Sequence, residues 1–408
     1  MDTFIARQPI FDQQQKVYAY ELLFRSGMQN NFCDSSDLNR AASKVIADSG
    51  MLLGTESITG GKKAFINVTR DVLLNELVIL LPKDLTVVEI LETVDPDPEV
   101  IAACQKLKQA GYLLALDDFI YDERYEPLVE MADIIKVDCL ATGREAQAAL
   151  VRRINQSNKQ ALLLAEKVET REAFQEAVDM GFSYFQGYFF CKPTILSKKD
   201  VPGFKLQYLR ILQEIHKPEL DFGQIEMIIR RDLSLAYKLL RYINSASFSW
   251  RSEIESIRQA LMLLGEKQLK KWVSLVVLTS MGKDKAEELV LQAIIRAKFC
   301  ESLAPAFGLK GRTEDLFLMG MFSLIDAILD RPLDEALKDL PIADDIKAAI
   351  AGQESRLSPV YHFALAYERG DWEAAAAQSA QLIASESDLT KFYLDALEWA
   401  SQGFQTVA

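Results

Sequence analysis

Short apolar runs, each ending in a charged or amide residue, recur through the first half of this chain. They cover residues 17–21, 64–67, 86–89, 113–117, 134–136, 162–166 and 184–186. Runs that are almost wholly apolar are typical of parallel strands that are covered on both faces. The pattern therefore predicts seven buried parallel strands, separated by segments long enough to hold helices.

The polar residues that end these runs have the spacing of a repeated strand and helix. They are Glu21, Asn67, Glu89, the pair Asp117 and Asp118, Lys136, Glu166 and Gln186. From one to the next the spacings are 46, 22, 28, 19, 30 and 20 positions, enough for a strand, a loop and a return helix. Closed into a ring, such a repeat gives a TIM-like β/α barrel, whose active site lies at the carboxyl ends of the strands.

Acidic residues greatly outnumber basic ones at this predicted barrel mouth. Five carboxylates would repel one another strongly, and Lys136 alone supplies too little positive charge. Oxygen ligands without histidine or cysteine suit magnesium, manganese or calcium and disfavour zinc. Two such ions can activate a water and stabilise the leaving oxygen of a phosphodiester, so the set is interpreted as a site of phosphodiester hydrolysis. Singly, Glu21 or Glu89 would more often be a cap or a structural ion pair, but seven strand-end residues together favour a site.

The second half of the chain has a different pattern. Residues 193–204 lack apolar periodicity, and beyond them the periodicity is helical, as over 233–243 and over 254–264, which Gly265 is expected to terminate. We predict a barrel over 1–195, a linker over 196–204 and an all-α domain over 205–408. His216 and His362 are the only histidines and neither precedes an aspartate, so a structural or surface role is favoured for both.

The motifs of the first 195 residues resemble the EAL family of cyclic di-GMP phosphodiesterases. The matching segments are 20–25, 66–68, 89–92, 116–119, 136–138, 165–169, 186–188 and 192–193. The resemblance implies two bound metal ions, Mg²⁺ or Mn²⁺, with Ca²⁺ expected to bind without supporting turnover. It implies that the ligands of the first metal are Glu21, Asn67, Glu89 and Asp117. Asp118 would be shared with, or serve, the second metal.

The same resemblance implies roles for the other strand-end residues. Lys136 would hold the nucleophilic water, and Glu166 would act on the metal or on that water. Glu169 and Gln186 would orient water and ligand. Arg25 matches a phosphate-contacting arginine, whose planar fork suits a pair of phosphate oxygens. Glu92 matches a glutamate that braces the loop after the double aspartate.

Three departures from the EAL pattern bear on catalysis. Leu22 replaces an alanine, which is a mild change. Ile120 stands where a glycine is expected, and because a β-branched residue cannot readily take a positive φ, the loop after Asp118 must run differently. Lys167 replaces a small residue and could crowd the guanine pocket or add a phosphate contact. We therefore expect a slow or gated enzyme. The alternatives are a receptor that binds cyclic di-GMP without cutting it and a pure interaction protein.

Residues 231–246 and 257–265 resemble the HDOD domain, a helical relative of HD phosphohydrolases that lacks their metal site. The whole chain thus resembles a two-domain EAL-HDOD signalling family. The helical half is expected to regulate the barrel or to bind a protein partner that the sequence does not identify, unless it only stabilises the barrel. Asn244, Ser245, Trp250 and Arg251 could form a recognition surface or could cap a helix. Whether the chain forms a homodimer stays open.

Composition narrows the range of partners and locations. The chain has 408 residues, with 46 basic and 59 acidic side chains and a net charge of −13, which argues against general binding to nucleic acid or to an anionic membrane. The longest apolar runs fall far short of the eighteen or so residues of a membrane span. Five scattered cysteines without a Cys-x-x-Cys motif, and a start without a signal core, favour the cytoplasm.

Overall fold

The computed structural model describes residues 3–26, 55–141, 143–191, 203–217, 219–244, 254–379 and 386–407. The chain divides into two compact units. The first, here called the barrel unit, comprises Met1–Lys192, Leu365–Ala380 and Ala384–Lys391. The second, the helical unit, comprises Pro193–Ala364, Gln381–Ile383 and Phe392–Ala408. Most of the predicted linker lies outside the described residues, so its bounds stay a prediction.

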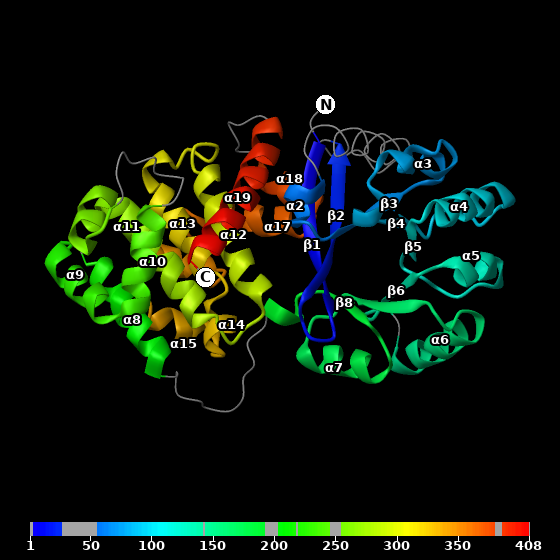
Figure 1. The fold of residues 1–408 in the computed structure, drawn as a ribbon, viewed down its shortest axis with the longest axis horizontal. Coiled ribbons are helices and arrows are strands. Elements are labelled where there is room, and N and C mark those ends of the chain that lie inside the picture. Colours follow the sequence, from blue (N-terminus) through cyan, green and yellow to red (C-terminus); the bar gives the residue numbers. More distant parts are fainter. Residues whose placement is uncertain are drawn as a thin grey trace. The chain divides into compact units, whose positions relative to one another are not determined.

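Eight strands form a closed ring in the barrel unit (Figure 1). They are β1 (Thr3–Asp12), β2 (Val17–Ser26), β3 (Lys63–Val68), β4 (Thr86–Ile90), β5 (Leu113–Leu116), β6 (Ile134–Asp138), β7 (Leu162–Glu166) and β8 (Tyr184–Gln186). Strands β2 to β8 are parallel, which confirms the predicted TIM-like barrel. The apolar runs did not reveal β1, which pairs antiparallel with both β2 and β8 and closes the ring.

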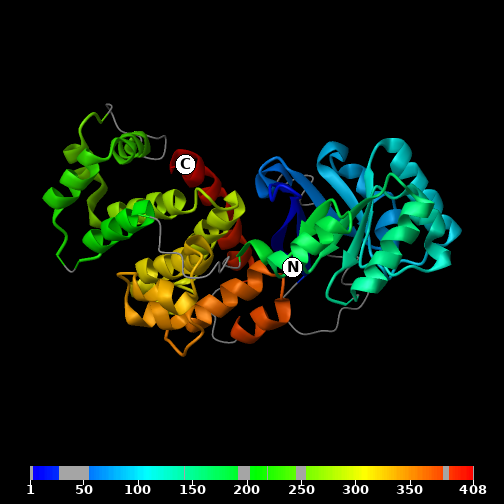
Figure 2. The same ribbon diagram turned by 90° about the horizontal axis from the view of Figure 1, so that it is seen from below.

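Helices lie outside the strands of the barrel, in blue to green in Figure 2. They are α2 (Thr55–Thr59), α3 (Arg70–Leu74), α4 (Pro98–Ala110), α5 (Glu126–Met131), α6 (Arg144–Ser157) and α7 (Arg171–Asp179). Helix α4 shows how local sequence sets the bounds. The Asp97 carboxylate accepts from the first backbone amides, Pro98 takes the first helical position, and Gly111 ends the helix at a φ of 93°.

The helical unit contains only helices within its described residues. They are α8 (Gly203–Ile215), α9 (Phe222–Arg231), α10 (Leu233–Ile243), α11 (Ile257–Met281), α12 (Glu287–Leu303), α13 (Thr313–Phe322), α14 (Ile325–Leu329), α15 (Leu333–Lys338) and α16 (Asp344–Ile350). The predicted all-α domain is thus confirmed. At Gly265 the backbone leaves the helical region, with φ 66° and ψ 174°, but another helical stretch follows at once and α11 continues to Met281. Gly265 therefore ends the first helical stretch of α11, as the sequence predicts, and a second stretch follows it under the same label.

The last helices are α17 (Ser358–Glu368), α18 (Trp372–Ser379) and α19 (Glu386–Val407). The division between the units falls within α17, so that its end and all of α18 belong to the barrel unit. It falls again within α19, whose residues from Phe392 onward belong to the helical unit. Tyr367 and Trp372 pack on Phe4 of β1. The centroid of the Phe4 ring lies 6.1 Å from that of Tyr367 and 5.8 Å from that of Trp372. Phe4 and Tyr367 are fully buried. A segment from the far end of the chain therefore contributes to the core of the barrel unit.

Candidate active site

The strand-end residues predicted from the sequence lie directly above an apolar layer inside the ring. That layer includes Ala19, Phe65, Val87, Ala115, Ile134 and Leu164, all essentially inaccessible to solvent. Two positions further along the same strands stand Glu21, Asn67, Glu89, Asp117, Lys136 and Glu166. Since residues two apart on a strand share a face, the apolar layer forms the floor and the polar residues form the next layer toward the mouth.

Lys136 holds four carboxylates together in this polar layer. Its side chain is only 1% exposed. Its Nζ lies 2.8 Å from Asp117 Oδ1, 2.9 Å from Glu166 Oε1 and 3.5 Å from Glu21 Oε2. It also donates to Glu89 Oε1. The ammonium is thus the counter-charge around which the carboxylates gather.

One positive charge cannot balance four carboxylates in a buried site. Burial raises the pKa of Glu89 well above its ordinary value, and it raises the pKa of Glu166 to about 8. Burial alone would lower the pKa of Lys136, but the surrounding carboxylates hold that pKa well above its ordinary value. Without metal, the site therefore keeps Lys136 charged and retains at least one carboxyl proton at neutral pH.

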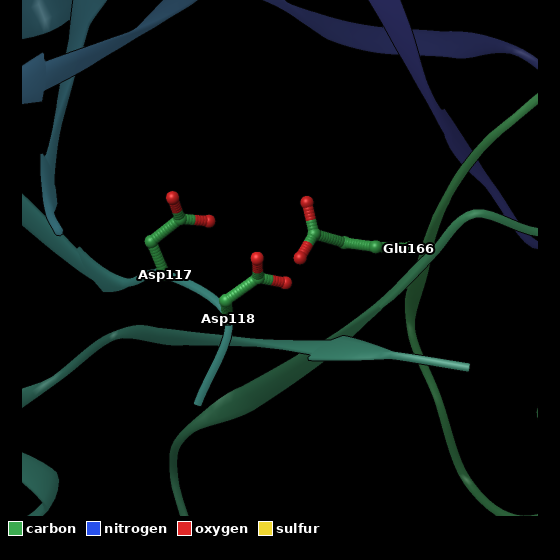
Figure 3. A group of neighbouring side chains, drawn as sticks. All are labelled: Asp117, Asp118 and Glu166. Carbon is green, nitrogen blue, oxygen red and sulfur yellow. The ribbon is translucent and has the colours of Figure 1, made fainter. Parts of the chain in front are cut away.

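Two of the carboxylates that contact Lys136 also form a cluster with Asp118. Carboxylate oxygens of Asp117, Asp118 and Glu166 all lie within 4.8 Å of one another. Figure 3 shows the three carboxylates facing a common space, two of them from the chain after β5 and one from β7. The backbone of Asp118 has a φ of 38°, which turns the chain sharply after Asp117. This local geometry brings adjacent aspartates to one site.

Several buried oxygens in this site have no hydrogen-bond partner. They are Asn67 Oδ1, Glu89 Oε2, Asp118 Oδ1, Glu166 Oε2 and Gln186 Oε1. Buried polar atoms are rarely left unsatisfied, so such a concentration requires an explanation. Carboxylate and amide oxygens are the ligands that hard divalent cations take. The donor set fits such an ion, as the sequence predicted.

Mn²⁺ binding is expected to release about one proton per site at pH 7. The pKa of Glu166 near 8 means that this carboxyl is largely protonated at pH 7 and must lose its proton to become a ligand. Apparent affinity for Mn²⁺ should accordingly rise by up to about tenfold from pH 6 to pH 7. Titration calorimetry in two buffers of different ionisation heat measures the release, and Glu166→Gln should release fewer protons than the wild type. Equal heats in both buffers would contradict the protonated carboxyl.

The structure adds Gln8 to this site, a residue that the sequence did not suggest. Gln186 Nε2 donates to Glu21 Oε2 at 2.6 Å and to Gln8 Oε1 at 2.9 Å. Gln8 faces Glu21 in the register of β1 and β2. Strand pairing is the signal that could have identified Gln8. Ile10 belongs to the apolar floor, and β1 runs antiparallel to β2, so the residue two positions before Ile10 lies in the polar layer above the floor.

The remaining candidates are Arg25, Glu169 and Glu92. Arg25 is half-buried, four residues beyond Glu21 and thus on the same face of β2. Glu169 is exposed, three residues past the end of β7. Glu92 is exposed too, and it is its main-chain carbonyl that accepts a hydrogen bond from the Tyr125 hydroxyl at 3.2 Å. The bracing role of Glu92 and the roles of Arg25 and Glu169 stay predictions.

The loop after Asp118 adopts its conformation without a glycine. Ile120 is 83% exposed and does not take a positive φ, as expected of a β-branched residue. Phe119 is buried and contacts the rings of Tyr121 and Tyr125, each with centroids 6.2 Å apart. The loop borders a cavity of about 300 Å³ whose lining includes Ile90, Glu92, Asp117, Asp118, Phe119 and Tyr125. This cavity opens directly beside the paired aspartates.

Lys167 is not among the residues that line this cavity, and its side chain is paired. Its Nζ forms an ion pair with Asp138 Oδ2 at 2.6 Å. The Asp138 carboxylate also accepts from the backbone amides of Leu140 and Ala141. Lys167 therefore supports the loop that follows β6.

Comparison with known proteins agrees with the order of the two units. Residues 62–193 match the EAL domain, and residues 201–330 match the HDOD domain. The chain is 36% identical over 399 residues to the cyclic di-GMP phosphodiesterase CdgJ of Vibrio cholerae serotype O1, covering 98% of this chain and 92% of that protein. It is 35% identical over 407 residues to the uncharacterized protein YuxH of Bacillus subtilis, covering 98% of each chain. The chain belongs to the EAL-HDOD family.

Among solved structures, the c-di-GMP-bound FimX EAL domain from Pseudomonas aeruginosa is similar to the EAL-HDOD protein at 19% identity. The TM-score is 0.38, and the match covers 46% of this chain and 89% of that chain.

The helical unit of this EAL-HDOD protein shows no metal-binding cluster among its described residues. His216 is partly buried, with Nδ1 3.0 Å from the Leu212 carbonyl oxygen, and His362 is exposed. The Asn244 side chain bonds both to the amide and to the carbonyl of Ile254, at 2.8 Å each, so it has a structural role. The other predicted surface residues, Ser245, Trp250 and Arg251, lie outside the described residues.

Two further expectations concern the described part of the EAL-HDOD protein. No helix there is long and apolar enough to cross a membrane. The cysteines described, Cys104, Cys139, Cys191 and Cys300, form no disulfide with one another.

Proposed function

We propose that this EAL-HDOD protein hydrolyses cyclic di-GMP to its linear dinucleotide with two divalent ions, Mg²⁺ or Mn²⁺. The observation that carries the proposal is the set of buried oxygens without hydrogen-bond partners, gathered beside the Asp117, Asp118 and Glu166 carboxylates. The 36% identity to a protein named as a cyclic di-GMP phosphodiesterase supports the substrate class.

In this proposal the polar layer holds the metals. Glu21, Asn67, Glu89 and Asp117 would bind the first ion, and Asp118 with Glu166 would bind the second. Bound metals of this kind lower the pKa of a water and stabilise a leaving oxygen.

The other residues act on water and ligand. Lys136 Nζ, already buried among the carboxylates, would donate to the attacking water, and Glu166 Oε2 would accept its proton. Gln186 Oε1, which is buried without a donor, would accept a hydrogen bond from water or ligand, with Glu169 assisting. Arg25 would contact a phosphate oxygen pair.

We further propose that turnover is slow or gated. To bind metal, the site must loosen the contacts of Lys136 with four carboxylates and lose at least one carboxyl proton. Because both steps cost free energy, we expect the site to bind metal only under some conditions. A protein partner of the HDOD part, self-association, or both could supply that control. The same observation supports the alternative of a receptor that binds cyclic di-GMP without cutting it.

The test is incubation of the pure protein with cyclic di-GMP and Mn²⁺, followed by chromatography for the linear product. Glu21→Ala should reduce turnover by about 10²-fold or more, because it removes a metal ligand. Glu130→Ala alters an exposed glutamate on α5 and should leave turnover unchanged. No product together with binding in Ca²⁺ would make the protein a receptor, and neither product nor binding would overturn the proposal.

A further inference from the structure

The turn between α17 and α18, residues 369–371, lies outside both ranges that match the EAL and HDOD domains. It nevertheless belongs to the barrel unit. Gly370 has a φ of 67°, and the Asp371 carboxylate accepts from the Ala374 amide at 3.0 Å, so that it caps α18. The turn is therefore a defined element held between two helices.

Three hydrogen bonds connect this turn with the proposed metal site. Gln8 Nε2 donates to the Arg369 carbonyl oxygen at 2.9 Å. Gln8 Oε1 accepts from Gln186 Nε2 at 2.9 Å, and Gln186 Nε2 also donates to Glu21 Oε2 at 2.6 Å. The series begins at an exposed carbonyl and ends at a buried carboxylate.

The polarity of this series is set at both ends, because the Arg369 carbonyl and the Glu21 carboxylate only accept. A carbonyl only accepts, so Gln8 must present its amide nitrogen to Arg369 and its oxygen to Gln186. Gln186 must then present its nitrogen to Gln8, which also directs that nitrogen to Glu21 and leaves Oε1 without a donor. If the Arg369 carbonyl moved away, the Gln8 amide could rotate and Gln186 could lose its hold on Glu21.

Close packing fixes the carbonyl in place. A Cβ added at Gly370 would lie 2.5 Å from Leu23 Cδ1, so the turn touches β2 two residues beyond Glu21. The Arg369 guanidinium stands 5.1 Å from the centroid of the Tyr188 ring, and cation–π contacts of this kind are favourable.

We propose that the 369–371 turn is a positioning element of the active site and that Gln8 is its positioning residue. Through Gln8 and Gln186 the turn orients the Glu21 carboxylate for metal binding. The inference rests on the proposed function only in requiring that the site binds a divalent metal. Residues that orient a metal ligand typically change metal affinity or activity by about 10- to 100-fold when they are replaced.

The experiment measures the Mn²⁺ affinity of the full chain by titration calorimetry, with cyclic di-GMP turnover recorded separately. Gly370→Ala moves the turn without altering the site, and Gly60→Ala is the matched control, since Gly60 has a φ of 62° and open space around it. Gln8→Ala breaks the series, and Gln13→Ala is its control, because Gln13 donates to the Phe182 carbonyl at 3.0 Å from the hairpin loop between β1 and β2.

Gly370→Ala and Gln8→Ala should each weaken Mn²⁺ binding by about tenfold, and the double variant should be no weaker than Gln8→Ala alone. Both controls should bind as the wild type does. Unchanged affinity in either single variant, additive effects in the double variant, or no Mn²⁺ binding at all would overturn the inference. If Mn²⁺ affinity falls in the two variants but no turnover is detected, the inference holds and the proposed hydrolysis fails. If turnover is detected but Mn²⁺ affinity is unchanged in the variants, the proposed hydrolysis holds and the inference fails.

Discussion

Replacing Lys136 with methionine is expected to reduce turnover strongly and to destabilise the metal-free barrel unit by about 3–5 kcal/mol at pH 7.5. The substitution leaves four buried carboxylates without their counter-charge. Turnover should fall by at least about 10²-fold, because a preorganised donor to the reacting water is lost. Chemical denaturation with and without Mn²⁺ measures the stability, and Mn²⁺ should restore much of it.

The loss in Lys136→Met should shrink as the pH falls. Buried carboxyls such as Glu89 and Glu166 have folded-state pKa values above their unfolded values, so they favour the folded state at low pH and oppose it as the pH rises toward about 8. The variant should therefore come closer to the wild type at pH 5.

Lys106→Met is the matched control, since Lys106 is exposed and pairs with Glu76 at 2.9 Å on the surface. It should leave the stability essentially unchanged, because solvent screens an exposed ion pair. Equal stability of Lys136→Met and wild type at pH 7.5 would contradict the role of Lys136 as the counter-charge.

Ending the chain at residue 204 is expected to disrupt the barrel unit, although the EAL motifs end before that point. The truncation removes Tyr367 and Trp372, which pack on Phe4 of β1, and it removes the acceptor of Gln8. The point variant Tyr367→Ala isolates the packing term, and it should cost about 3–5 kcal/mol because a fully buried aromatic ring is lost.

Hydrogen exchange measured by segment shows where the loss falls. Tyr367→Ala should accelerate exchange in β1 and β2. Tyr393→Ala is the control within the helical unit, where Tyr393 is buried against Phe299 with ring centroids 5.2 Å apart. It should leave β1 unchanged. A truncated chain with native stability would show that the α17–α18 segment is dispensable for the barrel.

Much of the site could be predicted from the sequence because it follows from local patterns. Glu166 ends β7, and Glu89 stands one residue before the end of β4, so the apolar runs placed both near the carboxyl ends of parallel strands. Ile120 could be excluded from a positive φ on steric grounds alone. By contrast, β1 was missed because Arg7, Gln8 and Pro9 interrupt its apolar pattern.

The sequence by itself determined the barrel strands β2 to β8, the helical second half, and the chemical class of the residues at the barrel mouth. These features depend on periodicity and on residue type, which act over a few positions along the chain. Only the tertiary structure decided that β1 closes the ring, that Lys136 gathers four carboxylates, and that the 369–371 turn contacts Gln8. These contacts join residues as far as 361 positions apart, and they are set by ring closure and packing rather than by any local pattern.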